Sequence, residues 1–363
     1  MDCNYFGVCG SCTLYDLDYE KQVEKKSEYI KELFSLESLE VFKSPQSHYR
    51  SRAEFRIWHE DDGISYGMHR LDKKGILKIE ECPKVDIAIY NLMPKLKKMI
   101  EEDEELRRKL FGVEFLCGES EVLVTLIYHK PINESWVESA KKLQKPGILL
   151  IGRSRGVKLV VDRDFVIDSL HVREKEYRYK IEEGSFSQPN KTVNQKMIEW
   201  VALHVKDGRD LLEMYCGHGN FTIPLSQEFR RVLATEISKK SISAAKYNCE
   251  LNGVENIEFV RLSASELSEA LEGKREFKRL RGIDLKSFDF SHVFVDPPRA
   301  GIDEESLKFI SKFENIIYIS CNPQTLKRDL EFLDKTHKIV DFAMFDQFPY
   351  TSHIESGVIL IHK

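Results

Sequence analysis

Hydrophobic and polar positions follow different patterns in the two halves of this chain of 363 residues. In the first half, residues 16–36 have helical periodicity. Residues 47–59 alternate between polar and apolar side chains, which predicts a strand with a basic face carrying Arg50 and Arg52. Helices are predicted over 85–104 and 134–143, and strand pairs over 111–129 and 149–162. We therefore expect a mixed α+β domain over residues 1–185, ending at a loop near 183–192.

The second half, residues 186–363, alternates short apolar runs with helical segments. Runs near 210–215, 232–236, 257–264, 292–296 and 316–320 predict strands with helices between them. Strands and helices that alternate in this way form a parallel, doubly wound sheet. The last two runs, 338–345 and 357–363, predict a closing antiparallel strand pair. The expected fold class is α/β, with a Rossmann-like second domain.

Residues with useful chemistry stand where these predicted strands end. Cys321 follows one strand, Asp296 follows another and is stiffened by two prolines, and Glu236 ends a third. Open α/β sheets bind ligands at this edge, although a cysteine there can also be a packing residue. Gly217 and Gly219 lie in a loop that opens a helix, and Gly217 is 19 positions before Glu236. This pattern suits an adenosyl cofactor better than a dinucleotide, because the full glycine fingerprint is missing.

Composition limits the class of protein. Hydrophobic residues make up 42% and charged residues 32%, which is typical of a globular protein, and no apolar run is long enough to cross a bilayer. The net charge of −5 argues against broad, non-specific nucleic-acid binding but allows local basic clusters. The N-terminus lacks the pattern of a secretory signal, so we expect a cytoplasmic protein that makes no membrane contact and has reduced thiols.

Three of the eight cysteines form a compact N-terminal motif. Cys3, Cys9 and Cys12 are separated by five and two residues, with glycines that let thiolates converge, and Cys82 before a proline is the candidate fourth ligand. The five-residue gap is wider than the common zinc spacing and favours a [4Fe–4S] cluster. Zinc is the alternative, since four thiolates also suit it, and unligated thiols are a third interpretation.

Taken together, the motifs resemble the RNA 5-methyluridine methyltransferases. The phrases LLEMYCGHGNF, LATEIS, FVDPPRAG, YISCNPQTL and FDQFPYTSHIESGV are most similar to the tRNA (uracil-5-)-methyltransferase branch. The residues that carry the resemblance are Gln188, Tyr215, Asn220, Glu236, Asp296, Cys321 and Glu355. The resemblance implies a class I methyltransferase domain that uses S-adenosyl-L-methionine, preceded by an RNA-binding domain.

It also implies roles and a substrate. Cys321 would be the nucleophile and Glu355 the base, with His353 as the other candidate base. Gln188, Tyr215, Asn220, Glu236 and Asp296 would bind the cofactor. The expected substrate is the T-loop uridine at position 54 of tRNA, and the product is 5-methyluridine.

Two other functions stay open. The cysteine motif is similar to the iron–sulfur motif of the branch that acts on 23S ribosomal RNA, which makes that RNA the alternative substrate. A redox-sensing RNA-binding module is the alternative from another class. For RNA contacts we expect Arg50 and Arg52 at phosphates, and Phe111 stacked in the space that a flipped uridine leaves.

Overall fold

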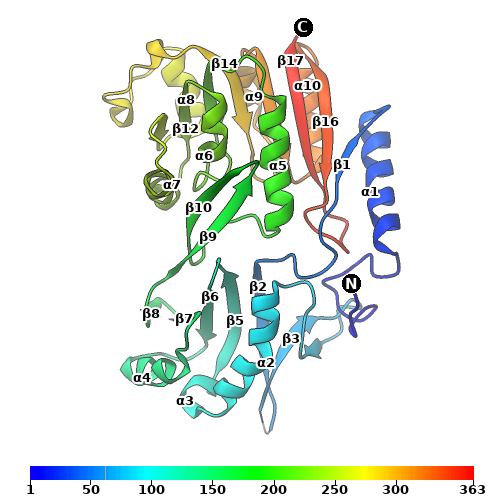
Figure 1. The fold of residues 1–363 in the computed structure, drawn as a ribbon, viewed down its shortest axis with the longest axis vertical. Coiled ribbons are helices and arrows are strands. Elements are labelled where there is room, and N and C mark those ends of the chain that lie inside the picture. Colours follow the sequence, from blue (N-terminus) through cyan, green and yellow to red (C-terminus); the bar gives the residue numbers. More distant parts are fainter. Residues whose placement is uncertain (62) are drawn as a thin grey trace.

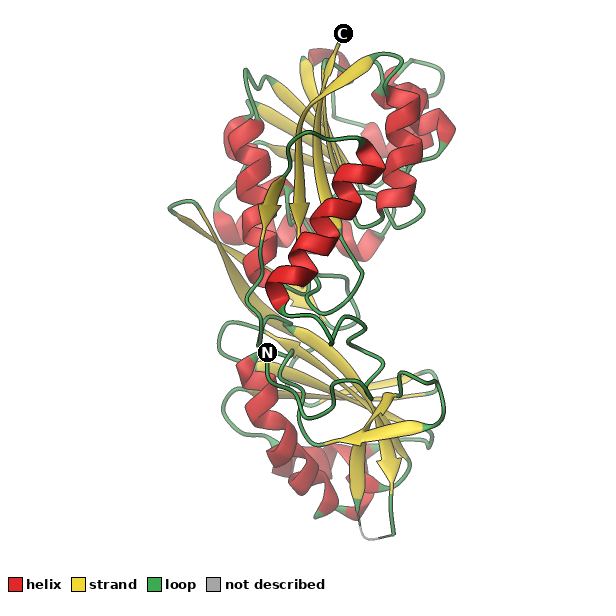
Figure 2. Ribbon diagram, turned by 90° about the vertical axis from the view of Figure 1, so that its right-hand side faces the viewer, coloured by secondary structure: helices red, strands yellow, loops and turns green. Residues whose placement is uncertain are grey.

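The computed structural model describes residues 1–61 and 63–363 (Figure 1). Its strands form a seven-stranded sheet, an eight-stranded sheet and a separate two-stranded ribbon. The two large sheets follow one another along the long axis of the molecule, as Figure 2 also shows from the side. The N-terminus lies near the junction of the two halves, and the C-terminus lies at the far end of the half that holds the eight-stranded sheet.

The seven-stranded sheet confirms the mixed α+β first half. In spatial order its strands are β4 (Ile76–Ile79), β3 (Ile64–His69), β2 (Arg52–His59), β5 (Leu110–Cys117), β6 (Val122–Tyr128), β7 (Ile148–Ser154) and β8 (Val157–Val160). The only parallel pair among these strands is β6 with β7. Helices α2 (Ile87–Glu101), α3 (Glu104–Arg107) and α4 (Glu134–Leu143) supply the helical side of its core.

The eight-stranded sheet confirms the Rossmann-like prediction. In spatial order its strands are β1 (Glu40–Phe42), β16 (His337–Phe345), β17 (Glu355–His362), β15 (Asn315–Ser320), β14 (Phe290–Val295), β11 (Asp210–Met214), β12 (Arg231–Thr235) and β13 (Ile257–Val260). From β13 to β15 all neighbours are parallel, whereas β17 is antiparallel to both β15 and β16. The chain runs outward from β11 to β13 and then returns to β14, so the strand order reverses between β11 and β14. Such a reversal is where open sheets bind ligands.

Helices cover both faces of this sheet, which explains the continuous apolar runs of its strands. Successive residues of a strand point to opposite faces of the sheet and pack in different hydrophobic cores. On β15, Ile317 belongs to the core on one face and Ile316 to the core on the other. One face carries α5 (Lys191–His204), α6 (Thr222–Leu225) and α7 (Lys239–Asn252). The other carries α1 (Tyr19–Phe34), α8 (Ala264–Leu271), α9 (Glu304–Ile310) and α10 (Pro323–Leu333). The short 3-10 segments are η1 (Ser226–Glu228), η2 (Lys278–Leu280) and η3 (Leu285–Ser287).

The division at residue 185 differs from the structure in one respect. Helix α1 and strand β1 belong to the second half of the molecule, because α1 packs on α10 and β1 pairs in parallel with β16. The ribbon of β9 (Phe165–Val172) and β10 (Lys175–Glu182) also packs against α5 and α7. A three-residue strand is too short to show alternation, and an amphipathic helix does not reveal which surface it covers.

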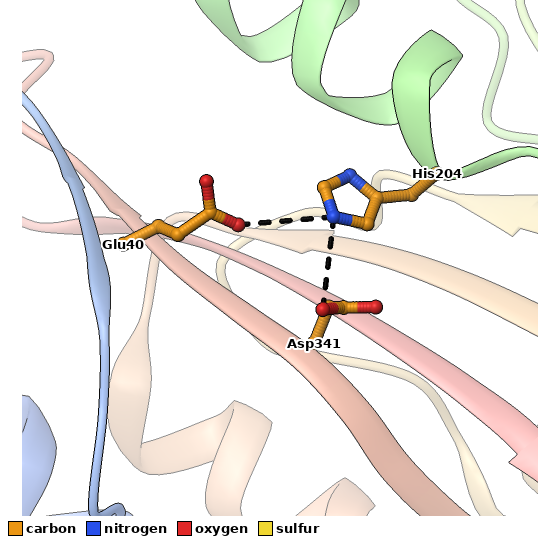
Figure 3. A group of neighbouring side chains, drawn as sticks. All are labelled: Glu40, His204 and Asp341. Atoms are coloured by element: carbon orange, nitrogen blue, oxygen red, sulfur yellow. Dashed lines mark ion pairs between the residues drawn. The ribbon is translucent and has the colours of Figure 1, made fainter.

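Side chains hold β1 in place at the edge of the sheet. The Trp200 indole on α5 donates a hydrogen bond of 2.9 Å to the Glu40 carboxylate on β1. His204 Nε2 lies 3.7 Å from both Glu40 and Asp341, so the three side chains from β1, α5 and β16 point toward one another (Figure 3). No helix in the described part of the chain is long and apolar enough to span a membrane.

Candidate functional site

Strand register aligns three of the predicted site residues. The last residue of β11, Met214, pairs with the last residue of β12 and with the last residue of β14. The next residue on each of these strands is a candidate: Tyr215, Glu236 and Asp296. The three side chains therefore meet at the carboxyl edge of the sheet.

The nucleophile and base candidates come from the neighbouring antiparallel pair. Ser320 at the end of β15 lies opposite Ser356 on β17. Cys321 and Glu355 are one step further along, where β15 ends and β17 begins, so register alone brings them to the same edge.

All seven candidates, including Gln188 and Asn220 from the preceding loops, line one cavity of about 750 Å³. We call it the acidic cavity, because it is lined by five carboxyl side chains and only one arginine, Arg299. The five are Glu213, Glu236, Asp296, Asp303 and Glu355. Those carboxyls that ionise in this cavity favour a cationic ligand.

Three of these carboxyls are held away from water. Burial raises the pKa of Asp296 to about 7. Burial, and then the nearby Asp296, raise the pKa of Glu355 well above its usual value. Burial also raises the pKa of Glu213 to about 8, and its Oε2 atom has no hydrogen-bond partner within the described residues. The sequence interpretation missed Glu213, because a residue inside an apolar strand was taken for a core residue. The available signal was a charged side chain within an otherwise apolar run.

The loop after β11 is shaped by backbone conformations that side chains rarely allow. Tyr215 has a φ of +66° and Gly217 a φ of +56°. Gly217 N–H donates to Glu236 Oε2 at 3.3 Å, and the other oxygen of Glu236 accepts from the Ser238 amide at 2.8 Å. A tyrosine in this region of φ is strained, and such strain concentrates at functional sites.

The two amide candidates have partners within the protein. Asn220 and Asn194 exchange two side-chain hydrogen bonds of 2.8 and 2.9 Å, which fixes the Asn220 amide while leaving one N–H and one lone pair for a ligand. Gln188 Oε1 accepts from Gln347 at 2.9 Å, and its own amide N–H groups are available to the cavity.

Cys321 is partly buried and lies at the boundary of two hollows. Burial, followed by the carboxyls of Glu355 and Asp296, raises the pKa of its thiol to about 11, while Arg299 acts in the opposite direction. Cys321 and Arg299 also line a second hollow of about 440 Å³, which we call the basic groove. The basic groove includes Lys25 and Lys26, and none of its lining residues is acidic.

The loop before Glu355, residues 346–354, is anchored by the N-terminal segment. Lys26 donates to Asp346 at 2.6 Å, and both side chains are buried. Tyr350 has a φ of +63°; its amide donates to Gln22 at 2.8 Å, and its carbonyl accepts from the Leu14 amide at 3.0 Å. The N-terminal segment therefore helps to set the position of the candidate base.

The four N-terminal cysteines lie in one electrostatic neighbourhood. Burial raises the pKa of Cys3, Cys12 and Cys82, and other thiols of the set, Cys9 among them, raise it further. A metal ion needs several ligand atoms close together. Among residues 1–61 and 63–363, the only three or more His, Cys or carboxyl side chains whose ligand atoms all lie within 4.8 Å of one another are Glu40, His204 and Asp341. No three of the four cysteine sulfurs therefore all lie within 4.8 Å of one another.

An aromatic platform lies on the first sheet. Phe111 stacks on His129 with ring centroids 4.0 Å apart, and the Arg56 guanidinium lies 5.2 Å from the Phe111 ring. Phe111 was predicted as a stacking residue, and Arg56 belongs to the basic strand face predicted over residues 47–59, but His129 was missed because only register brings it beside Phe111. Arg52, predicted as a phosphate contact, donates from Nη1 to the Ser185 carbonyl at 2.7 Å and keeps other N–H donors, so its contact with RNA stays a prediction.

The strand order, with its reversal between β11 and β14 and its final antiparallel strand, together with the acidic cavity at the carboxyl edge, defines a class I S-adenosylmethionine-dependent methyltransferase. The chain belongs to the tRNA (uracil-5-)-methyltransferase family, whose profile matches residues 18–363.

Relatives and a solved structure agree with this assignment. The chain is 53% identical to the tRNA/tmRNA (uracil-C(5))-methyltransferase of Nitratiruptor over 99% of both chains. It is 50% identical to the protein of that name from Neisseria meningitidis, over 95% of this chain and 99% of the relative. The crystal structure of the Pyrococcus abyssi tRNA (uracil-54, C5)-methyltransferase with S-adenosyl-L-homocysteine has a TM-score of 0.75 and 25% identity, covering 97% of this chain and 86% of that one.

Proposed function

We propose that this protein transfers a methyl group from S-adenosyl-L-methionine to C5 of a uridine in RNA, and that this uridine is the T-loop uridine at position 54 of tRNA. The observation that carries the proposal is the position of Cys321, opposite Glu355, between an acidic cavity and a basic groove. A cationic cofactor suits the first hollow and an anionic nucleic acid suits the second. The names of the relatives support tRNA, and they include tmRNA.

The acidic cavity is the proposed cofactor site. S-adenosyl-L-methionine supplies an electrophilic methyl group on a positively charged sulfonium. Glu236 would accept hydrogen bonds from the ribose hydroxyls, and Tyr215 would pack beside the ligand. Gln188, Asn220 and Asp296 would complete the site. The unpaired oxygen of Glu213 supports an additional hydrogen bond with the ligand.

Cys321 is the proposed nucleophile. C5 of uracil is too weak a nucleophile to take the methyl group directly. Addition of the Cys321 thiolate to C6 forms a C–S bond and moves electron density to C5, which then takes the methyl group. This divides one difficult step into two easier ones.

Glu355 is the proposed base. After methylation C5 still carries its proton, and the C–S bond breaks only when that proton leaves. The Glu355 carboxylate takes the proton, the C5–C6 double bond forms again, and Cys321 departs as a thiolate. Because burial raises the pKa of Glu355, its ionised form accepts a proton more readily than a surface glutamate does.

The platform of Phe111, His129 and Arg56 is the proposed RNA contact on the first sheet. Stacked aromatic rings beside a guanidinium accept bases of any sequence. Phe111→Ala should therefore weaken RNA binding and leave cofactor binding unchanged. Normal RNA affinity in this variant would contradict the assignment.

A covalent trap tests the central proposal. Protein, S-adenosyl-L-methionine and 5-fluorouridine-substituted tRNA should give an adduct that survives denaturation, because fluorine at C5 cannot leave as a proton. Cys321→Ser should form none. Absence of an adduct with the wild-type protein would refute the proposal and favour a redox-sensing RNA-binding module.

The same trap separates the two RNA substrates. The N-terminal cysteines are the observation that favours 23S ribosomal RNA as the alternative substrate. A T-arm RNA should form the adduct faster than ribosomal fragments do. Faster reaction with a ribosomal fragment would reverse this choice.

We further propose that Cys3, Cys9, Cys12 and Cys82 hold a [4Fe–4S] cluster. Tetrahedral zinc with bonds of about 2.3 Å brings its sulfurs to within about 4 Å of each other. The five-residue gap between Cys3 and Cys9 is wider than the common zinc spacing, and this supports the cluster. A brown anaerobic preparation containing iron would support the cluster, and a colourless preparation with one bound zinc would overturn it. We also propose a reducing, cytoplasmic location, in which the free cysteines would remain thiols.

A further inference from the structure

Helix α1 forms one wall of the basic groove. Tyr29 follows Lys25 by four residues and Lys26 by three, so each lysine is a neighbour of Tyr29 on the helix surface. The facing wall is the segment directly after Cys321, which includes Gln324. The Gln324 amide donates a 2.6 Å hydrogen bond to the Tyr29 hydroxyl and ties the two walls together.

The three side chains on α1 differ in burial and in their partners within the protein. Lys26 is buried and paired with Asp346, so it is already neutralised within the protein. Lys25 is exposed and forms no ion pair with any described residue. Tyr29 is 40% exposed although it is a large aromatic residue. Lys26 therefore anchors the helix, whereas Lys25 and Tyr29 remain available to a ligand.

The chemistry of the groove is that of a nucleotide site. It offers a free ammonium on Lys25, a guanidinium on Arg299 and an aromatic face on Tyr29, and none of its lining residues repels an anion. Lys25 and Arg299 suit a phosphate, while Tyr29 suits a base. The groove opens onto Cys321, whose other side faces the acidic cavity, so its occupant must be continuous with the reacting uridine.

We propose that the basic groove binds the nucleotide next to the target uridine, with its phosphate between Lys25 and Arg299 and its base against Tyr29. This inference rests on the proposed function, since it assumes an RNA substrate at Cys321. Helix α1 then acts in substrate recognition, although it lies on the methyltransferase half of the molecule.

The test compares Lys25→Glu and Tyr29→Ala with a control on the same helix. Lys31→Glu makes the same charge change at an exposed position that does not line the groove. Titration of a T-arm RNA at several salt concentrations gives the affinity and its salt dependence. S-adenosylmethionine affinity is measured in parallel, to show that each variant is folded.

Lys25→Glu should weaken RNA binding about tenfold and reduce the log–log salt slope by about 0.7, the value expected for one lost phosphate contact to a single strand. Tyr29→Ala should weaken RNA binding about five- to twentyfold, as expected for one lost stacked base, with the salt slope unchanged. Lys31→Glu should bind RNA within about twofold of wild type, and all three variants should bind the cofactor normally.

Modified RNA locates the contact. Methylphosphonates replace the phosphates of the T-loop one at a time and remove the charge at each. When the replaced phosphate is adjacent to the target uridine, wild type and Lys25→Glu should bind the RNA with nearly equal affinity. When it lies elsewhere, the difference in affinity between the two proteins should remain. An equal effect at every phosphate, or equal losses in Lys25→Glu and Lys31→Glu, would refute the groove. If wild-type protein forms no adduct with fluorinated RNA, the proposed function fails instead.

Discussion

The acidic cavity makes a prediction about how the nucleophile becomes reactive. In the ligand-free protein, burial and the carboxyls of Glu355 and Asp296 hold the pKa of Cys321 at about 11, so the thiol is almost wholly protonated near neutral pH. S-adenosylmethionine brings a positive sulfonium into the cavity that Cys321 lines. S-adenosylhomocysteine has nearly the same shape but no such charge. The first ligand should therefore lower the pKa of Cys321, and the second should not.

The size of the effect can be estimated. A unit charge about 6 Å away, at an effective dielectric constant of about 20, contributes about 3 kcal/mol, or about two pKa units. A pKa near 9 would raise the thiolate fraction at pH 8 about a hundredfold. The less basic thiolate is also a weaker nucleophile, and a Brønsted coefficient of about 0.45 reduces the gain to about tenfold.

Alkylation measures this directly. Iodoacetamide is small enough to approach Cys321 from the basic groove, and peptide mass spectrometry reports the rate at Cys321 separately from the buried Cys216 and Cys249. The rate at pH 8 should rise about tenfold with saturating S-adenosylmethionine, and it should stay unchanged or fall with S-adenosylhomocysteine. Equal rates with the two ligands would show that the sulfonium charge does not act on Cys321.

Three further predictions concern the same edge of the sheet. Burial raises the pKa of Asp296 to about 7, so between about pH 4 and 7 the folded protein keeps a proton that the unfolded chain releases, and stability falls as the pH rises through that window. Asp296→Asn should therefore be more stable than wild type by about 1–2 kcal/mol at pH 8, after allowance for water in the cavity, and no more stable at pH 4; equal urea midpoints at both pH values would contradict this. Glu355→Gln should accumulate the Cys321 adduct on unmodified tRNA, seen as a shifted band on denaturing gels, because the C5 proton cannot leave; normal turnover without the band would exclude Glu355 as the base. Tyr350→Ala should lower kcat more than tenfold and leave cofactor affinity unchanged, because the loop before Glu355 loses the buried ring that packs against Phe6 and Tyr19, although its backbone hydrogen bonds remain; an unchanged kcat would show that the loop keeps its position without this ring.

Much of the candidate site could be predicted because its residues follow predicted strands. Cys321, Asp296 and Glu236 each end an apolar run, and parallel strands bring their carboxyl ends together without any knowledge of register. Glu355 needed the family resemblance, since one carboxylate in a loop has no distinctive pattern.

The missed features depend on contacts between distant segments. The sequence shows Glu213 only as one charge in an apolar run, and only the folded chain reveals that its unpaired carboxyl faces a cavity. His129 meets Phe111 because β5 and β6 pair with a register shift, and no local pattern encodes that shift. The side chains of α1 show that one face is buried, but not that the helix crosses to the second half of the molecule.

The pairing of β1 with β16 has a practical consequence for dividing the chain. A fragment beginning at residue 186 would lose β1 and α1, although it keeps every residue that lines the acidic cavity. Strand β16 would then present unpaired backbone groups along its outer side, a surface on which other chains can assemble. Such a fragment should aggregate, whereas fusing residues 1–44 back onto it through a flexible linker should restore a soluble domain.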